Sequence, residues 1–362
     1  MKVLVWQWGQ RGAGPRFAAA LAAGFAGLDG VEALLSLSTG AEILRGAAAP
    51  PCALPMRTYR GVGGLAWRAV QAPVIIARLV ADLRRMQPEL AVCALPGPLD
   101  LLMIAALRRV GVPAVVIVHD AAPHPGDWVP LLFTLQRALI RRADAVVVLS
   151  EHVAARLRAQ SVLHPGTRLV VAAHPPFDFG PVRPPGAHAG PRRVLSFGRL
   201  LPYKGLDLLV EALRILGPRA DMEVRVVGQG PESATLAALR ALPGVTVENR
   251  WVAEDEVAAL LEWADLVVLP YREASQSGVA AAALAAGRVV VATRVGGLVE
   301  QLAGEPLALL CEADGAGVAA GMASVLEVSG RAIGRANGSR EGWRTLAEIV
   351  RGSIRTEIVQ AG

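Results

Sequence analysis

Short apolar runs rich in Val, Ile and Leu alternate along the whole chain with alanine- and leucine-rich stretches long enough to form helices. Strands that are buried on both faces of a parallel sheet have this continuous apolar character, and each needs a crossover, usually a helix, to reach its neighbour. The alternation therefore predicts an α/β fold of doubly wound parallel sheets covered by helices on both faces.

The strand candidates fall into two series. The first series covers residues 2–6, a weaker run at 31–37, and then 90–95, 114–119, 145–149 and 168–172. The second covers residues 193–197, 223–227, 245–249, 266–270, 289–293 and 307–311.

A proline-rich segment separates the two series, with six prolines from His174 to Pro191. Proline fixes φ and has no amide hydrogen, so neither a helix nor a central strand can continue through it. We expect a first domain at 1–175, a linker at 176–191, a second domain at 192–340, and a C-terminal helix at 341–362 that packs back towards the first domain. Because ligands of such sheets bind outside the carboxyl ends of the strands, the binding site is expected in a cleft that the two domains face.

Composition limits the compartment and the partners. No apolar run approaches the roughly 20 residues of a membrane-spanning helix, and the N-terminus lacks the basic and apolar regions of a secretory signal, so we expect a cytoplasmic protein. The three cysteines are too far apart for a disulfide framework or a zinc site and are expected to be free thiols.

Positive charge is concentrated in the first half of the chain. The first 180 residues carry 18 Lys and Arg against 11 Asp and Glu, a net charge of +7, whereas the rest of the chain carries −1. Such a field favours anionic partners. Nucleic acid is not expected among them, because aromatic residues make up only 4% of the chain and leave few stacking platforms.

Two cations occupy the loop after the first strand of the second series. Gly198, Arg199 and Lys204 lie there, just before a helical stretch expected at 208–216. Two fixed cations on one short strand-to-helix loop suit a diphosphate, since Arg can contact two oxygens and Lys acts as a point charge. The alternative is a pair of solvated surface cations.

A second polar loop, residues 270–279, follows the strand at 266–270. Ser277 is a plausible N-cap for an alanine-rich helix at 280–286, which Gly287 would end. The amides of Ser277, Gly278 and Val279 would then form an anion site at the helix N-terminus, with Gln276 beside them. Glu273, just upstream, could accept hydrogen bonds from sugar hydroxyls, although an ordinary helix start and a surface acid are the alternative.

These two loops together resemble the retaining, nucleotide-sugar-dependent glycosyltransferases of family 4, which have the GT-B fold of two Rossmann-like domains. The resemblance covers most of the chain and is strongest at 193–300, where Gly296–Glu300 also matches a family loop. It implies that Arg199 and Lys204 bind the donor diphosphate and that Glu273 binds the donor sugar. A second family Glu, which grips the ribose, is replaced here by Ala281, or by Ala282 if the loop carries one extra residue; this implies changed ribose recognition.

The resemblance also assigns residues in the first domain. It implies that His119, at the end of a strand, contacts the donor sugar at the reaction centre, although a lone His at a strand end can equally be a capping or core residue. Asp120 and His124 are candidates for the acceptor pocket. In the first glycine loop, Gly12 or Gly14 would face the diphosphate, with a purely structural helix start as the alternative.

Other motifs complete the expected donor site. The sequence Gly228-Gln229-Gly230-Pro231 lacks the third glycine of a dinucleotide fingerprint and follows the second strand of its domain. In the family this turn lies near the nucleotide, so Gly228, with Trp251 and Val252 near the base, is expected to contact it.

The resemblance thus implies a hexosyltransferase-like enzyme that moves a sugar from a nucleoside diphosphate sugar, with UDP or GDP as the expected nucleotide, to an acceptor hydroxyl in polysaccharide, glycolipid or other glycoconjugate biosynthesis. His119, Glu273, Arg199 and Lys204 are the expected catalytic residues, and no metal or cofactor is expected. The donor should bind mainly the second half and the acceptor mainly the first. A nicotinamide dehydrogenase, a GT-B nucleotide-sugar epimerase and a non-catalytic nucleotide-sugar-binding protein are the rivals.

Basic and apolar residues are interleaved in two stretches of the first half. Arginines cluster with Trp67 and the run Val74-Ile75-Ile76, and residues 131–142 combine Leu and Phe with three arginines. Both stretches are candidate interfacial helices that could hold the protein peripherally on an anionic membrane, plausibly because the acceptor is lipid-linked. Ordinary surface helices with solvated arginines are the alternative.

Overall fold

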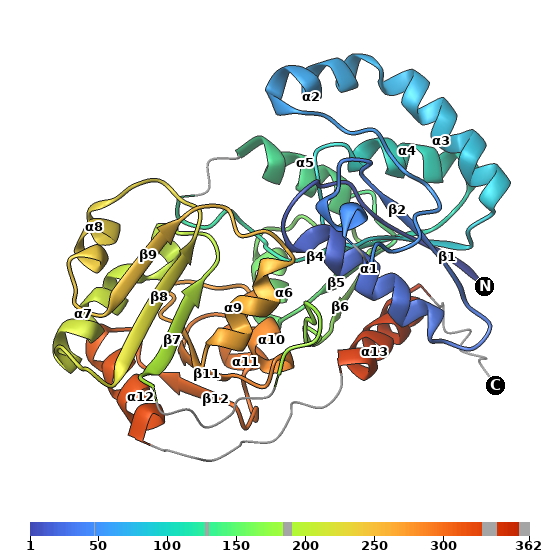
Figure 1. The fold of residues 1–362 in the computed structure, drawn as a ribbon. Helices are drawn as coiled ribbons and strands as arrows, with labels where there is room; N and C mark the ends of the chain where they lie inside the picture. The colour runs from blue at the N-terminus through green and yellow to red at the C-terminus, as the bar shows by residue number, and fades with distance from the viewer. Residues whose placement is uncertain (47, 127–129, 184–189, 328–338, 355–362) are drawn as a thin grey trace, which may run out of the picture. The chain divides into compact units, whose positions relative to one another are not determined.

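The computed structural model describes residues 1–46, 48–126, 130–183, 190–327 and 339–354 of the 362. By their contacts these residues form two compact units. Unit 1 lies within Met1–Pro123, Val129–Ala173 and Arg340–Gly362, and unit 2 lies within His124–Trp128 and His174–Ser339. Figure 1 shows that each unit is built around its own sheet.

Unit 1 contains a six-stranded, all-parallel sheet in the order β2-β1-β3-β4-β5-β6. Its strands are β1 Lys2–Gln7, β2 Glu32–Leu37, β3 Leu90–Cys93, β4 Ala114–Val118, β5 Ala145–Val148 and β6 Arg168–Val171. Its helices are α1 Ala13–Ala26, α2 Gly61–Val70, α3 Ala72–Met86, α4 Asp100–Val110, α5 Pro130–Ile140, α6 Glu151–Ala159 and α13 Ser339–Gly352, with a short 3-10 helix at Glu42–Arg45.

Unit 2 contains a second six-stranded parallel sheet, in the order β12-β11-β10-β7-β8-β9. Its strands are β7 Arg192–Phe197, β8 Met222–Gly228, β9 Val245–Asn249, β10 Leu266–Leu269, β11 Val289–Thr293 and β12 Ala308–Cys311. Its helices are α7 Leu206–Leu216, α8 Ala234–Arg240, α9 Glu256–Trp263, α10 Gly278–Ala285, α11 Leu298–Gln301 and α12 Gly315–Glu327, and a 3-10 turn covers Pro202–Lys204.

The α/β prediction is confirmed, and each of the twelve expected strands is present within two residues of its expected ends. The central strands show why the apolar runs were informative. Every residue of β3, β4, β5 and β10 is buried, because helices cover both faces of each sheet. In β10, Val267 packs into the apolar core on one face and Val268 into the core on the other.

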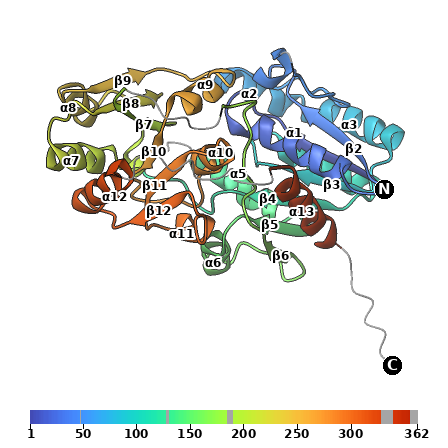
Figure 2. The ribbon, with the colours of Figure 1, turned by 60° about the horizontal axis from the view of Figure 1, so that its bottom comes forward.

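The C-terminal helix α13 packs on α1 within unit 1 (Figure 2). The Trp343 ring lies edge-on to Phe17 with 4.8 Å between ring centroids, and a Cβ at Gly24 would lie only 2.4 Å from the Trp343 carbonyl oxygen. The final segment therefore contributes to the core of unit 1, although it follows unit 2 in the sequence.

Within the described ranges, no single helix combines the length and apolarity needed to cross a bilayer. The bent pair α2 and α3, which meet at 71°, reaches that combined length and composition. However, α3 buries Ile75, Leu79 and Leu83 in the core of unit 1, which accounts for its apolar residues as those of a core helix.

Candidate functional site

The sheet of unit 2 reverses its strand order at β7. Strand β8 lies on one side of β7 and β10 on the other, and their connections leave in opposite directions. In open α/β sheets the crevice at such a switch point, outside the carboxyl ends of the strands, is where ligands bind. The two loops that leave the sheet there follow β7 and β10, and these are the two loops that the sequence selected.

The loop after β7 arranges both of its cations around an aromatic side chain. Tyr203 is buried, the guanidinium of Arg199 donates a hydrogen bond to its hydroxyl at 2.7 Å, and Lys204 Nζ lies 5.1 Å from its ring centroid. Lys204 Nζ also lies 3.8 Å from the ring centroid of Tyr271, which follows β10. The aromatic rings thus hold two positive charges close together at the strand ends.

Backbone contacts hold the two loops together. The Arg272 amide donates to the Tyr203 carbonyl oxygen at 2.8 Å, and the Arg272 guanidinium forms an ion pair with Asp207. This hydrogen-bonded pair lowers the pKa of Asp207. Gly205 has a φ of 61° and comes so close to the next loop that a Cβ there would lie 1.8 Å from the Pro270 carbonyl oxygen. Only glycine fits, so the spacing of the two loops is fixed by the backbone.

His124 joins this cluster although it follows a strand of unit 1 in the sequence. Its ring stacks on Tyr203, with 4.4 Å between centroids and 11° between planes. Its Nδ1 atom lies 3.7 Å from a carboxylate oxygen of Glu273. His124 thus lies beside donor-loop residues, while its expected role in the acceptor pocket stays a prediction.

Helix α10 begins as the sequence predicts. Ser277 is its N-cap and accepts a hydrogen bond from the Ala280 amide, and Gly287 has a φ of 68° just past the helix end. The Ser277 amide, however, donates to the side chain of Gln301 at 2.7 Å, and Gln301 donates back to the Ser277 carbonyl oxygen. Gln301 therefore competes with any anion for one of the three amides expected to bind it.

The alanines that replace the second family Glu are inside the molecule. Ala281 is 3% exposed and Ala282 is 1% exposed, and Ala282 packs among apolar side chains of the core. A carboxylate at either position would be desolvated. The changed ribose recognition expected of this segment stays a prediction.

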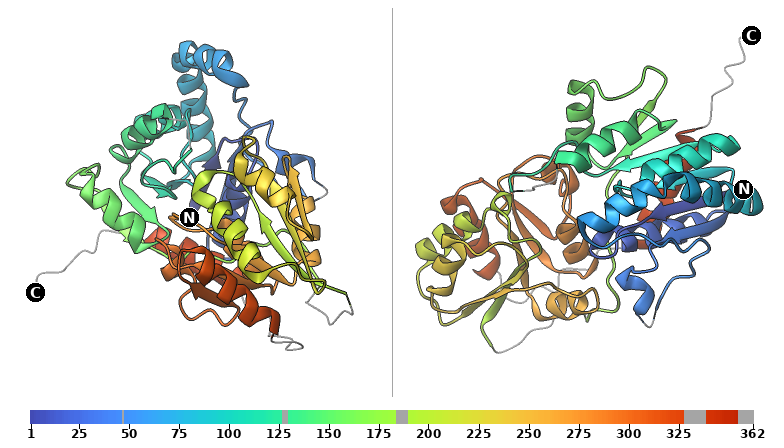
Figure 3. Two further views of the ribbon diagram at one scale, coloured as in Figure 1. Left: turned by 90° about the vertical axis from the view of Figure 1, so that its left-hand side faces the viewer. Right: turned by 90° about the horizontal axis from the view of Figure 1, so that it is seen from above.

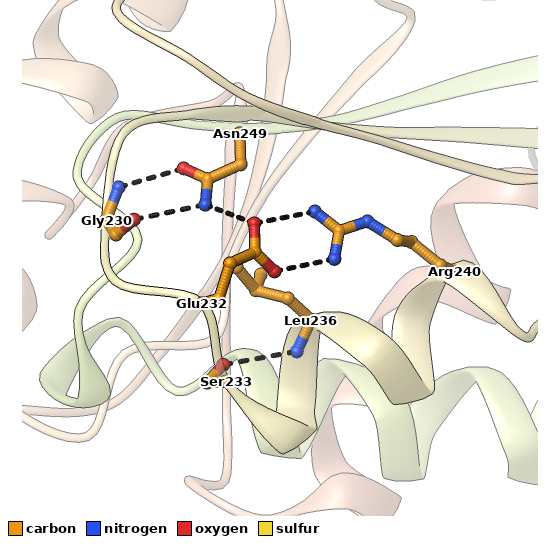
Figure 4. A network of polar contacts seen from close by, with 6 residues as sticks. All are labelled: Gly230, Glu232, Ser233, Leu236, Arg240 and Asn249. Carbon is orange, nitrogen blue, oxygen red and sulfur yellow. Dashed lines mark hydrogen bonds and ion pairs between the residues drawn. The ribbon is translucent and has the colours of Figure 1, made fainter.

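The turn after β8 is held by a polar network that the sequence did not reveal (Figure 4). The side chain of Asn249 accepts from the Gly230 amide at 3.1 Å and donates to the Gly230 carbonyl oxygen at 3.0 Å. Asn249 also donates to Glu232, which pairs through both oxygens with Arg240. These hydrogen bonds, led by that from Arg240, lower the pKa of Glu232 to about 2.

The glycines of this turn allow close backbone approach. A Cβ at Gly228 would lie 1.7 Å from the Gly198 carbonyl oxygen, and a Cβ at Gly230 would lie 2.2 Å from the Leu200 carbonyl oxygen. The turn is therefore packed directly on the loop that carries Arg199. Of the residues expected near the base, Trp251 is exposed and Val252 packs against the core.

In unit 1, His119 lies at the end of β4 as expected. Its Nε2 is hydrogen-bonded to the Ala94 carbonyl oxygen at 2.9 Å, so this nitrogen carries the proton, and its ring lies edge-on to Phe17. Burial lowers the pKa of His119, although the hydrogen bond to Ala94 opposes this effect. Burial thus favours the neutral form of this imidazole. Asp120 follows it, and its carbonyl oxygen accepts a hydrogen bond from Gln136.

The first glycine loop has structural reasons for its glycines. Gly12 has a φ of 81° and is the N-cap of α1. A Cβ at Gly14 would lie 2.9 Å from Gln7 Nε2 and 3.2 Å from a Leu95 methyl group. Packing alone thus accounts for Gly14, and its contact with a diphosphate stays a prediction.

Unit 1 has a pocket at its own switch point, between the carboxyl ends of β1 and β3. The cavity has a volume of about 380 Å³. Its wall includes the segments after β1 and β3, together with Thr58 and Tyr59 from the chain that leads into α2. Gln10 secures that wall by donating to the Thr58 hydroxyl and to the Tyr59 carbonyl oxygen.

Asp100, which also lines this pocket, is 1% exposed. Its carboxylate accepts hydrogen bonds from Trp6 Nε1 at 3.1 Å, from the Gly97 amide at 2.6 Å and from the Cys93 thiol at 3.3 Å. Burial raises the pKa of Asp100 to about 7, and the three donors oppose the rise. No local sequence pattern marks Asp100, because its partners lie on two strands and one loop.

No metal centre is evident in the part of the chain that the structure describes, because no three His, Cys, Asp or Glu side chains gather there as a metal would require.

Two family models match the chain. One, described as Glycosyltransferase Family 4, matches residues 18–174, and the other, described as Glycosyl transferases group 1, matches residues 191–328. The chain belongs to glycosyltransferase family 4. The predicted GT-B fold is confirmed: Anabaena HepE in complex with UDP and glucose superposes with a TM-score of 0.66 and 16% identity, over 98% of this chain and 97% of that one.

Curated relatives of this family 4 chain include a 2-deoxystreptamine glucosyltransferase of Streptomyces kanamyceticus, 31% identical over 59% of this chain and 62% of the relative. A GDP-mannose:glycolipid 4-beta-D-mannosyltransferase of Xanthomonas campestris pv. campestris is 28% identical over 53% of each. The chain thus spans between half and two thirds of the length of these two relatives.

Proposed function

We propose that this chain transfers a sugar from a nucleoside diphosphate sugar to an acceptor hydroxyl, with retention of the anomeric configuration. The observation that carries the proposal is the pair of cations, Arg199 and Lys204, held with Glu273 at the switch point of the second sheet. The loop geometry supports donor binding there, and membership of the family supports transfer chemistry. UDP or GDP is the proposed nucleotide.

The bond that breaks joins the anomeric carbon to the diphosphate, and the diphosphate leaves with the electron pair. The acceptor oxygen attacks from the same face, and its proton passes to the departing phosphate oxygen. Negative charge therefore grows on the diphosphate as the bond lengthens. Arg199 and Lys204, already held in place by Tyr203 and Tyr271, would stabilise that charge without rearrangement.

The sugar is proposed to lie near Glu273, whose carboxylate is partly exposed and can accept hydrogen bonds from hydroxyls. His119 is proposed as a second sugar contact on the strength of the family motif. We assign neither residue as a covalent nucleophile.

We further propose that the reaction is independent of divalent metal, because the two cations can serve the leaving diphosphate. Transfer should continue at the same rate after dialysis against EDTA. A loss of activity that Mg²⁺ or Mn²⁺ restores would contradict this part of the proposal.

The test of the proposed function is incubation of the chain with UDP- and GDP-sugars, with and without sugar and glycolipid acceptors, followed by product analysis. Transfer with the anomeric configuration kept, read by NMR coupling constants, supports the proposal. Conversion of the donor sugar without an acceptor would favour an epimerase. Donor binding with neither sugar transfer nor slow donor hydrolysis would favour a non-catalytic protein. The alanines in α10, which replace the second family Glu, are the reason to consider this alternative.

A further inference from the structure

Helix α2 is apolar, yet none of its side chains is fully buried, and Leu65 packs against the core of unit 1 while partly exposed. Its sequence is GVGGLAWRAV, and Arg68 is its one charged residue. Helices in proteins are usually stabilised by packing an apolar face against the rest of the molecule. Besides the side that carries Leu65, α2 has a second apolar side that is exposed: Val62 is 86%, Trp67 61% and Val70 71% accessible, and at 100° per residue the three fall on one side of the helix.

The exposure is concentrated at this place. Among the described residues, four of the nine large apolar side chains that are most exposed lie between Val62 and Val74. Figure 1 shows α2 at the end of an arm that it forms with α3, which Figure 3 shows from two further sides, and α3 packs against α4. Ile75, Leu79 and Leu83 pack α3 on the core of unit 1. The apolar run 74–76, which the sequence suggested for a membrane contact, is therefore only partly available: Val74 is exposed, whereas Ile75 is buried.

The sequence on either side of α2 carries charge of a single sign. Residues 43–81 contain five arginines and neither Asp nor Glu. Arg57, Arg60 and Arg78 are exposed, before and after the apolar side chains in the sequence. An exposed apolar stripe with an aromatic residue and a cationic border matches the layered chemistry of an anionic bilayer surface, where phosphate groups lie above acyl chains.

The arm is joined to the pocket of unit 1. Arg68 of α2 donates through Nε to the Thr58 carbonyl oxygen, and Thr58 and Tyr59 form part of the pocket wall. A surface that α2 contacts would therefore be adjacent to the chain segment that lines the pocket. That arrangement would suit an acceptor whose polar head enters the pocket while its tail remains in the lipid.

We propose that α2 is a membrane-docking element, which places Trp67 and Val70 among the lipid headgroups of an anionic bilayer, with the surrounding arginines on the phosphates. Helix α5 has a smaller part in this contact, because its Leu131 is exposed but its Leu139 and Ile140 are buried in the core. Docking needs no sugar donor, so it can fail while the proposed transfer stands, and the reverse also holds.

The test uses the full chain and vesicles of phosphatidylcholine, with or without phosphatidylglycerol. The protein should pellet with the anionic vesicles at low salt and be released at high salt. The double variant Trp67→Ser/Val70→Ser should lose at least about tenfold in partition coefficient. Reversal of two charges in Arg57→Glu/Arg78→Glu should lose at least about 25-fold, since each basic residue contributes about fivefold.

Ile215→Ser and Arg214→Glu are the matched controls, because both side chains are exposed on α7 of unit 2. They should bind vesicles as the wild type does. Nucleoside diphosphate binding in solution and thermal melts show whether each variant is folded. Brominated lipid should also quench the fluorescence of Trp67, and the Trp67→Phe variant should lose that quenching.

Wild-type protein that stays in the supernatant with anionic vesicles would overturn the proposal. So would a folded Trp67→Ser/Val70→Ser variant that pellets like the wild type, or a loss of binding in the α7 controls equal to that in the α2 variants.

Discussion

Replacement of Asp100 by asparagine should change how the stability of the protein depends on pH. Asp100 is a buried carboxyl group. Among the ion pairs in the described part of unit 1, none includes Asp100. Its pKa is about 7 in the folded protein and 3.8 in the reference state. A shift of about three units corresponds to roughly 4 kcal/mol of cost for ionisation in the folded state.

The sign follows from proton binding. Between pH 4 and 7 the folded protein holds a proton on Asp100 that the unfolded chain has released, so stability falls as pH rises. The cost is absent below the unfolded pKa and complete above the folded pKa. An asparagine side chain does not titrate, so the Asp100→Asn variant lacks this component of the pH dependence.

The measurement is urea unfolding of wild type and Asp100→Asn at a series of pH values from 4 to 8.5. The difference between their free energies of unfolding should shift in favour of the variant by up to about 4 kcal/mol across that range. At acid pH the variant should be the less stable, because its amide cannot accept from Trp6, Gly97 and Cys93 together. Asp29→Asn, at an exposed position, controls for the loss of one carboxylate. A difference that stays constant with pH would show that Asp100 is not a proton-binding site with a raised pKa in the folded protein.

Further predictions concern the donor site. Asn249→Ala should weaken nucleoside diphosphate binding severalfold in calorimetry, because it releases the Gly230 turn. Arg240→Ala leaves both Asn249–Gly230 bonds in place and should bind as the wild type does. Wild-type affinity in Asn249→Ala would show that the turn does not matter for binding. Glu273→Ala and His119→Ala should each lower the transfer rate far more than they weaken binding of the free nucleoside diphosphate, because both are placed at the sugar. Parallel losses in rate and nucleotide affinity would mean that they are misassigned.

Most of the fold could be predicted from the positions of the apolar runs in the sequence. Apolar runs such as β4 and β10 are buried on both faces, so their sequences could hardly belong to anything but central strands. The approach of the loops after β7 and β10 was also predictable, since parallel strands end at a common edge. The capping of α10 by Ser277 followed from local chemistry alone.

Contacts between distant parts of the chain were not predictable from local patterns. The stacking of His124 on Tyr203 joins residues 79 positions apart in the sequence. Asp100 accepts hydrogen bonds from Trp6 and Cys93, which lie on two different strands. The hydrogen bond from the Ser277 amide to the Gln301 side chain likewise depends on how α11 packs against the start of α10. Nor could an apolar stretch show which of its side chains are buried, as Val74 and Ile75 illustrate.

We expect the loop carrying Arg199 and Lys204 to bind the diphosphate of a nucleotide sugar. Isothermal titration of the wild type with UDP and GDP, and of Arg199→Ala and Lys204→Ala with whichever binds, tests it directly. Each variant should lose about 1.5–3 kcal/mol, or roughly ten- to 150-fold in affinity. Arg214→Ala, an exposed arginine of the same unit, should bind as tightly as the wild type. Unchanged nucleotide affinity in both loop variants, with the fold intact by circular dichroism, would contradict the account.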